Sequence, residues 1–108
     1  MAVKGGMALY IGGMGARDKN FYNDLAKRLG YEEAAVEIQN LFLSGKKMEA
    51  AAAVPDSLVD AVHLVGPKAK IRDRLQAWKE AGRKGWVHTM QIGTSQPEAL
   101  ELLATELL

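Results

Sequence analysis

The hydrophobic positions along the chain predict a short strand near each end. Met7 to Ile11 is a short apolar run closed by glycines. Such a run is typical of a buried strand, and we expect a strand near residues 7–12. Trp86 to Ile92 alternates between apolar and polar residues and is rich in aromatic and β-branched side chains. This pattern favours a second strand over residues 86–92.

Between and after these two segments, the apolar spacing is helical. Phe21, Leu25 and Leu29 recur every four residues, and Gly30 follows as a typical helix stop. Asn20, just before this stretch, is expected to cap the helix together with its neighbours Asp18 and Asn23. Helices are expected within residues 18–82 (21–29, 32–43, 46–53, 55–62 and 67–82) and over residues 96–108.

These elements suggest a fold class. Two strands do not make an independent sheet, whereas a strand followed by a helix is how an α/β barrel ends. A complete barrel of that kind needs about 250 residues, and this chain has 108. We therefore expect an α/β, helix-rich chain: a single domain over residues 1–108 that forms the C-terminal fragment of a TIM-type barrel.

Composition excludes several classes of function. With 14 basic and 13 acidic residues the net charge is +1, which gives no electrostatic reason to expect a nucleic-acid or membrane partner. The absence of cysteine excludes disulfides, thiolate metal sites and cysteine nucleophiles. The first residues lack the pattern of a signal peptide, so a cytoplasmic location is expected.

Several segments together resemble a known family. They are Ile11–Arg17, Lys19–Asn23, Gly30–Ala34, Glu49–Pro55, Leu64–Pro67 and Arg74–Gly82. As a set they resemble the luciferase-like monooxygenases, most of all the branch that depends on coenzyme F420. The resemblance implies a TIM barrel roughly three times as long, of which this chain is similar to the C-terminal third.

The resemblance also implies a cofactor and an activity. The complete parent would bind a deazaflavin at the C-terminal mouth of its barrel and transfer hydride to or from a substrate. The first barrel strands, which supply most of the ring pocket in the family, have no counterpart in this sequence. Hydride transfer is therefore expected of the parent, and this chain would keep at most the phosphate-binding half of the cofactor site.

Two loops are candidates for that phosphate site. Gly12 and Gly13 follow the first predicted strand, where free backbone amides can hold a phosphate. Gly93, Thr94 and Ser95 lie between the last strand and the last helix, where barrels commonly bind phosphate groups. The alternatives are a tight turn with positive φ at the first loop and a plain helix cap at Ser95.

A metal-dependent hydrolase is the alternative function. Asp60 and His63 are three residues apart on a predicted helix and so share a face. With His88 they could hold a divalent metal such as zinc at a subunit interface, or act as general acid-base groups. Water bound to zinc becomes a nucleophile near neutral pH.

Truncation of a barrel would leave apolar side chains uncovered. We expect this of Leu9, Ile11, Val87 and Ile92, and large exposed apolar patches drive association. A homodimer or higher homo-oligomer is therefore expected to complete the core. A folded oligomer without activity remains the third possibility.

Overall fold

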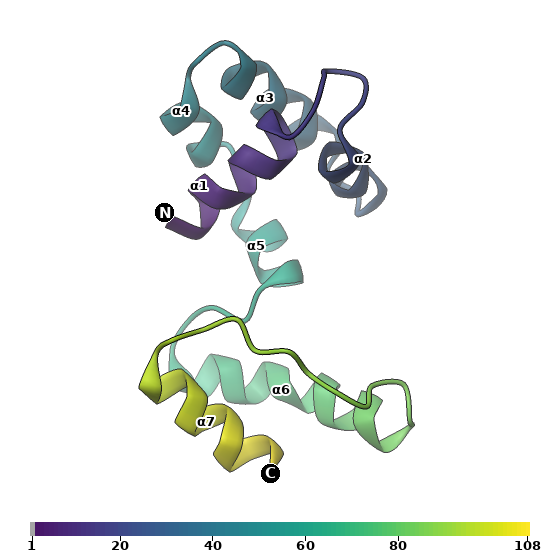
Figure 1. The fold of residues 1–108 in the computed structure, drawn as a ribbon, viewed down its shortest axis with the longest axis vertical. Helices are drawn as coiled ribbons and strands as arrows, with labels where there is room; N and C mark the ends of the chain where they lie inside the picture. Colours follow the sequence, from purple (N-terminus) through teal and green to yellow (C-terminus); the bar gives the residue numbers. More distant parts are fainter. Residues whose placement is uncertain (1) are drawn as a thin grey trace. The chain divides into compact units, whose positions relative to one another are not determined.

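The computed structural model describes residues 2–108, which form two compact units, one ending at His63 and the other spanning Leu64–Leu108. Figure 1 shows that both units are built from helices. The single domain expected over residues 1–108 stays a prediction.

The N-terminal unit is organised around one central helix. Its elements are α1 (Ala2–Ala8), the π-helical turn η1 (Leu9–Gly13), α2 (Phe21–Arg28), α3 (Glu32–Leu43), α4 (Lys47–Ala52) and α5 (Asp56–Val62). Helix α3 packs against η1, α2 and α4, and α1 packs against α4 (Figure 1). The bounds of α2 to α5 lie within a residue or two of the helices predicted there.

Small side chains let these helices approach closely. Ala8, Ala35 and Ala50 are fully buried in the core. They belong to the same core as Ile38 and Leu58, which are among the largest side chains with almost no exposed surface. Burial of one such aliphatic side chain contributes about 1.5–3 kcal/mol. The alanine-rich sequence therefore serves packing as well as helix propensity.

The strand predicted near residues 7–12 was wrong. Residues 2–13 are helical, as α1 continued by η1. Val3, Met7 and Ile11 lie four residues apart and all contribute to the core or pack against it. That spacing places them on one helix face, which the short window from Met7 to Ile11 concealed.

The C-terminal unit is a pair of helices, α6 (Lys68–Arg83) and α7 (Pro97–Leu107), that lie side by side (Figure 1). Leu75 of α6 and Leu102 of α7 are buried. Glu106 Oε1 lies 2.7 Å from Arg72 Nε, and its Oε2 lies 3.2 Å from Lys79 Nζ. One carboxylate on α7 therefore pairs with two cations on α6.

The second predicted strand was also wrong. Residues 86–92 have no regular secondary structure, and the isolated bridge between Ala16 and Lys19 is the only β pairing in residues 2–108. A strand requires a partner that accepts and donates its backbone hydrogen bonds, and the described chain offers none to this segment. The described residues are thus helix-rich as expected, but they do not form an α/β fold.

Across residues 2–108, no helix combines the length and the hydropathy that a membrane-spanning segment requires.

Candidate functional site

Gly12 and Gly13, predicted to bind phosphate, instead lie in a helix–helix contact. A Cβ on Gly12 would lie 2.6 Å from Cβ of Phe42 on α3, and a Cβ on Gly13 would overlap the Phe42 ring. Neither glycine has a positive φ, and both belong to η1, whose amides are used within the helix. These two glycines therefore allow η1 to approach α3.

The positive-φ turn that was the alternative occurs at Gly15. Its φ is +149°, and a Cβ there would overlap the carbonyl of Lys19. The amide of Lys19 donates to the carbonyl of Ala16 at 3.0 Å, which closes the turn. Only glycine fits this conformation without strain. The segment from residue 14 to 19 is thus an exposed turn at the end of η1.

Two buried asparagines hold this turn in place. Asn20 Nδ2 donates to the carbonyls of Tyr10 and Ile11, both at 3.0 Å. Asn23 Nδ2 donates to Ile11 O at 3.1 Å and to Ala35 O at 2.8 Å. The last carbonyls of a helix lack partners within it, and at the end of η1 these amides supply them. The pair joins η1, α2 and α3.

Asn20 also performs the capping role expected of it. It is the N-cap of α2, and its Oδ1 accepts from the Asn23 amide at 3.0 Å. Both asparagines are only 2% exposed. The sequence indicated the cap, whereas the contacts to Tyr10 and Ile11 involve a segment that the sequence predicted as a strand.

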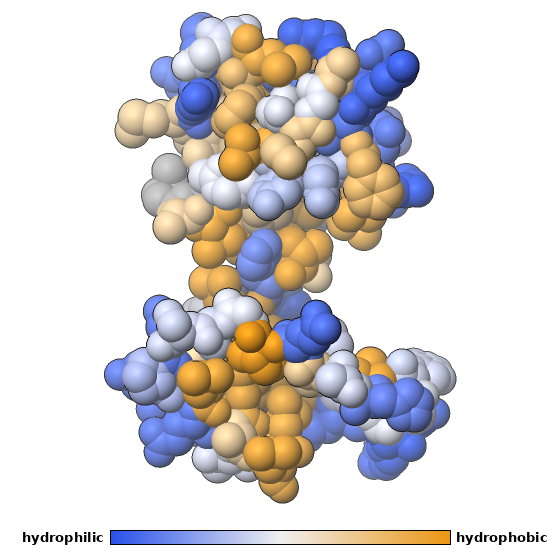
Figure 2. Space-filling view, viewed as in Figure 1, coloured by the Kyte–Doolittle hydropathy of each residue, from blue (hydrophilic) through white to orange (hydrophobic). Residues whose placement is uncertain are grey.

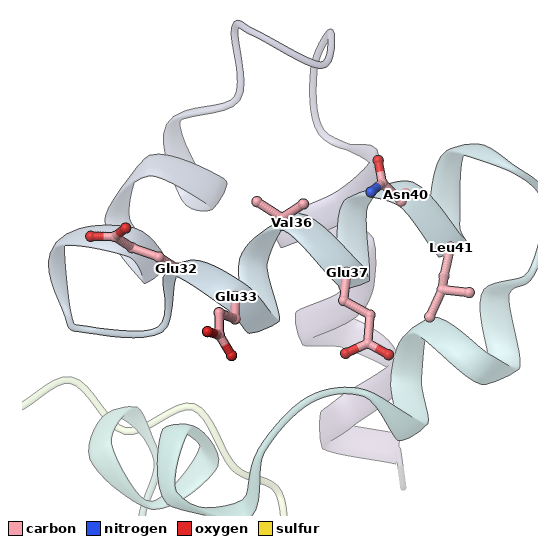
Figure 3. A pocket seen from close by; sticks show the side chains of 6 residues that line it. All are labelled: Glu32, Glu33, Val36, Glu37, Asn40 and Leu41. Carbon is pink, nitrogen blue, oxygen red and sulfur yellow. The ribbon is translucent and has the colours of Figure 1, made fainter.

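A shallow acidic hollow lies along α3, beside the exposed turn. Its volume is about 610 Å³. It is lined by Glu32, Glu33, Val36, Glu37, Asn40 and Leu41, all from α3 (Figure 3). The carboxylates of Glu33 and Glu37 point to the same side of the helix (Figure 3). Arg17 of the turn donates to Asn40 Oδ1 and so links the turn to the hollow.

Gln39 marks another feature that sequence patterns did not reveal. Its side chain is 4% exposed, and its Nε2 is buried without a hydrogen-bond partner among residues 2–108. Burial of that particular position depends on the packing of η1 and α4 against this helix.

The second predicted phosphate loop lies in the C-terminal unit. Ser95 is exposed, and the N-cap of α7 is Gln96, whose side chain makes no capping bond. The expected Ser95 cap was therefore wrong. Thr94 Oγ1 accepts from the Gln96 amide at 3.2 Å, which orders the loop, and Gly93 is exposed.

The N-terminal unit does not fit the phosphate of a deazaflavin at the predicted place. At Gly12 and Gly13 the Phe42 side chain fills the space. The nearby hollow carries three carboxylates, which would repel an anion. Gly93, Thr94 and Ser95 belong to the other unit, and phosphate binding there stays a prediction.

The predicted metal ligands are divided between the two units. Asp60 on α5 and His63 at its end lie in the N-terminal unit, whereas His88 lies in the C-terminal unit. Among residues 2–108, no three His, Asp or Glu side chains come together in a way that could hold a metal ion. The hydrolase alternative, whose site would form at a subunit interface, stays a prediction.

The apolar residues expected at an uncovered face differ in exposure. Leu9 is 43% and Ile92 41% exposed, while Val87 is half-buried. Ile11 is only 5% exposed and belongs to the core, so the expectation was wrong there. A helical rather than extended backbone turns Ile11 inward next to Ala8.

Comparisons with known proteins identify the relatives of this chain. The model of the luciferase-like monooxygenase family matches residues 2–85. The chain is 44% identical over 80 residues to a Mycobacterium tuberculosis (strain ATCC 25618 / H37Rv) protein named "Putative coenzyme F420-dependent oxidoreductase Rv3520c". That segment is 74% of this chain and 23% of the relative's length. No solved structure matches. This chain belongs to the luciferase-like monooxygenase family.

Proposed function

We propose that this chain is the C-terminal part of a coenzyme F420-dependent oxidoreductase, which in its complete form transfers hydride between the deazaflavin and a substrate. The observation that carries the proposal is the 44% identity over 80 residues to a relative named for that cofactor. Since those residues are 23% of the relative, most of the catalytic machinery would be contributed by other segments.

Within such an enzyme, the N-terminal unit would be a helical scaffold. A bound deazaflavin would supply the hydride chemistry. Asn20 and Asn23 hold the exposed turn against η1 and α3, and Gly12 and Gly13 allow the close helix contact beside it. These residues would therefore position the turn that carries Arg17. None of them is proposed to contact the cofactor phosphate.

A chimera tests the proposal. The aligned 80 residues of the mycobacterial relative are replaced by those of this chain, and F420 binding is measured by fluorescence titration beside the unmodified relative. We expect a dissociation constant within about tenfold of that of the relative, a difference of about 1.4 kcal/mol. Hydride transfer is then followed by the absorbance of the deazaflavin.

The controls separate a scaffold from a binding site. The same chimera with Asn23→Ala should lose affinity together with thermal stability, since the residue acts through the fold. The isolated chain should show no saturable F420 signal. A correctly folded chimera that does not bind F420, beside a relative that does, would overturn the proposal.

A further inference from the structure

One face of the N-terminal unit exposes five large apolar side chains. They are Tyr10 of η1, Phe21, Tyr22 and Leu25 of α2, and Leu29 at the end of α2. Their exposed fractions range from 37% for Leu25 to 65% for Phe21. We call this set the α2 face. Figure 2 shows apolar side chains at the surface of this unit over α2.

The aromatic part of the α2 face is already ordered within one chain. The rings of Tyr10 and Tyr22 meet edge to face with centroids 4.8 Å apart, and those of Phe21 and Tyr22 lie 5.5 Å apart. The guanidinium of Arg28 lies 5.8 Å from the centre of the Phe21 ring. Ordered aromatic and arginine side chains are characteristic of protein interfaces, because little conformational entropy is lost on binding.

The spacing of the apolar residues on α2 is symmetric about Leu25. Phe21 precedes Leu25 by four residues and Leu29 follows it by four, which corresponds to about 6 Å along the axis on either side. When a second copy of α2 lies antiparallel across a two-fold axis at Leu25, Phe21 of each chain faces Leu29 of the other. The face is therefore complementary to itself.

The charges on the same helix support this pairing. Asp24 and Arg28 are exposed, and because they are four positions apart they lie on one flank of α2. In the antiparallel arrangement, Asp24 of one copy and Arg28 of the other are offset by only about 3 Å along the axis. The long arginine side chain spans that offset. Parallel helices in register would instead place like charges side by side.

We propose that the α2 face binds a second copy of this chain, with the two α2 helices antiparallel around Leu25. Two Asp24–Arg28 ion pairs would flank an apolar centre. Taking roughly 200 Å² for a large side chain, the α2 face exposes about 450 Å² per copy. Two copies would bury at most about 900 Å² in total, which is the size of a weak, transient contact, so we expect the dimer to dissociate in the upper micromolar range. The proposal does not rest on the cofactor.

Sedimentation velocity of the full chain from about 1 μM to about 1 mM is the first test. We expect a monomer–dimer equilibrium over this range. Leu25→Glu places two carboxylates at the two-fold axis and should weaken dimerisation at least tenfold. The matched control is Met48→Glu on α4, where the side chain is 82% exposed and lies outside the α2 face. It should leave the equilibrium unchanged.

Charge reversal provides the decisive test. Asp24→Arg and Arg28→Asp each place like charges across the interface, and each variant alone should dimerise several-fold more weakly. An equimolar mixture of the two variants pairs opposite charges at both positions and should restore association. Circular dichroism establishes that every variant is folded.

Three results would overturn the proposal. The first is a monomer at every concentration, which would leave the α2 face to another segment of a longer protein. The second is a dimer that survives Leu25→Glu. The third is a mixture of the charge variants that associates no better than either variant alone. The first result would leave the proposed oxidoreductase function unaffected, because the chimera reports on it separately.

Discussion

Asn20 and Asn23 donate side-chain hydrogen bonds to three backbone carbonyls, those of Tyr10, Ile11 and Ala35. Both are almost completely buried, and so are their hydrogen bonds to Ile11 and Ala35, so these amides cannot bind water instead. A buried polar group that loses its partner retains its full desolvation cost. At the scale of single residues, the end of η1 depends on this pair.

Substitution of Asn23 tests that dependence. Asn23→Ala should lower the free energy of unfolding by about 1–3 kcal/mol, because two carbonyls lose a donor. Asn23→Asp should cost more at neutral pH, because a carboxylate would face those carbonyls without a proton to donate. Urea denaturation measures both effects.

The control is the same chemical change at an exposed position. Asn40→Asp on α3 should alter the free energy of unfolding by less than about 0.5 kcal/mol. If Asn23→Asp lowered the free energy of unfolding no more than this control, the hydrogen bonds to Ile11 and Ala35 would not stabilise the fold.

At the scale of elements, the contact between η1 and α3 explains the glycine pair. Gly13 has no space for a Cβ because the Phe42 ring occupies it, whereas Gly5 in α1 has nothing within 4 Å of that position. Glycine is disfavoured inside helices, so its presence at Gly13 reflects packing.

A double-mutant cycle measures this contact. Gly13→Ala should destabilise the chain by about 1–3 kcal/mol, because the new methyl overlaps the ring. In a Phe42→Ala background the same change should be neutral or stabilising, since alanine is the better helix former by about 1 kcal/mol. Thermal unfolding of the four proteins gives the coupling energy.

Gly5→Ala is the matched control and should be stabilising by up to about 1 kcal/mol in either background. If Gly13→Ala lowered the free energy of unfolding equally with and without the Phe42 ring, packing against α3 would not require this glycine.

The α6–α7 pair makes a pH-dependent prediction. Hydrogen bonds from Lys79 and then Arg72 hold the pKa of Glu106 below its ordinary value of 4.5. The unfolded chain therefore binds a proton at Glu106 at higher pH than the folded one. The stabilisation is fully present above pH 4.5 and is lost as pH falls through the folded pKa.

Glu106→Gln should make this unit less stable at pH 7 and nearly indistinguishable from the unmodified chain in acid. The measurement is the midpoint of thermal unfolding between neutral pH and about pH 2. Glu101 is an exposed carboxylate on the same helix, and Glu101→Gln should leave the change in unfolding midpoint between the two pH values as it is in the unmodified chain. The prediction would be contradicted if the unfolding midpoints of Glu106→Gln and the unmodified chain differed by the same amount at all pH values.

At the scale of the whole molecule, the family assignment and the structure address different questions. The match over residues 2–85 crosses from one compact unit into the other, so the two units are parts of one family segment. The homo-oligomer expected from truncated barrel strands becomes, in the proposal above, a specific dimer through α2. Its apolar stripe is the four-residue spacing of Phe21, Leu25 and Leu29, from which the sequence predicted a helix.

The sequence alone determined the family and most of the helices, because both depend on local signals. Four-residue apolar spacing, prolines and glycine stops delimit α2 to α6 to within a few residues. A resemblance spread over many short segments identifies relatives without any knowledge of contacts. Charge balance and the absence of cysteine likewise follow from composition.

The tertiary structure decided everything that depends on which surfaces meet. Residues 7–11 are helical because Val3, Met7 and Ile11 share a core with α3, and a short apolar run is compatible with either backbone. Gly12 and Gly13 serve packing because Phe42 approaches them from a distant position in the chain. A strand at 86–92 would need a partner, and pairing is a non-local property that no window of sequence contains.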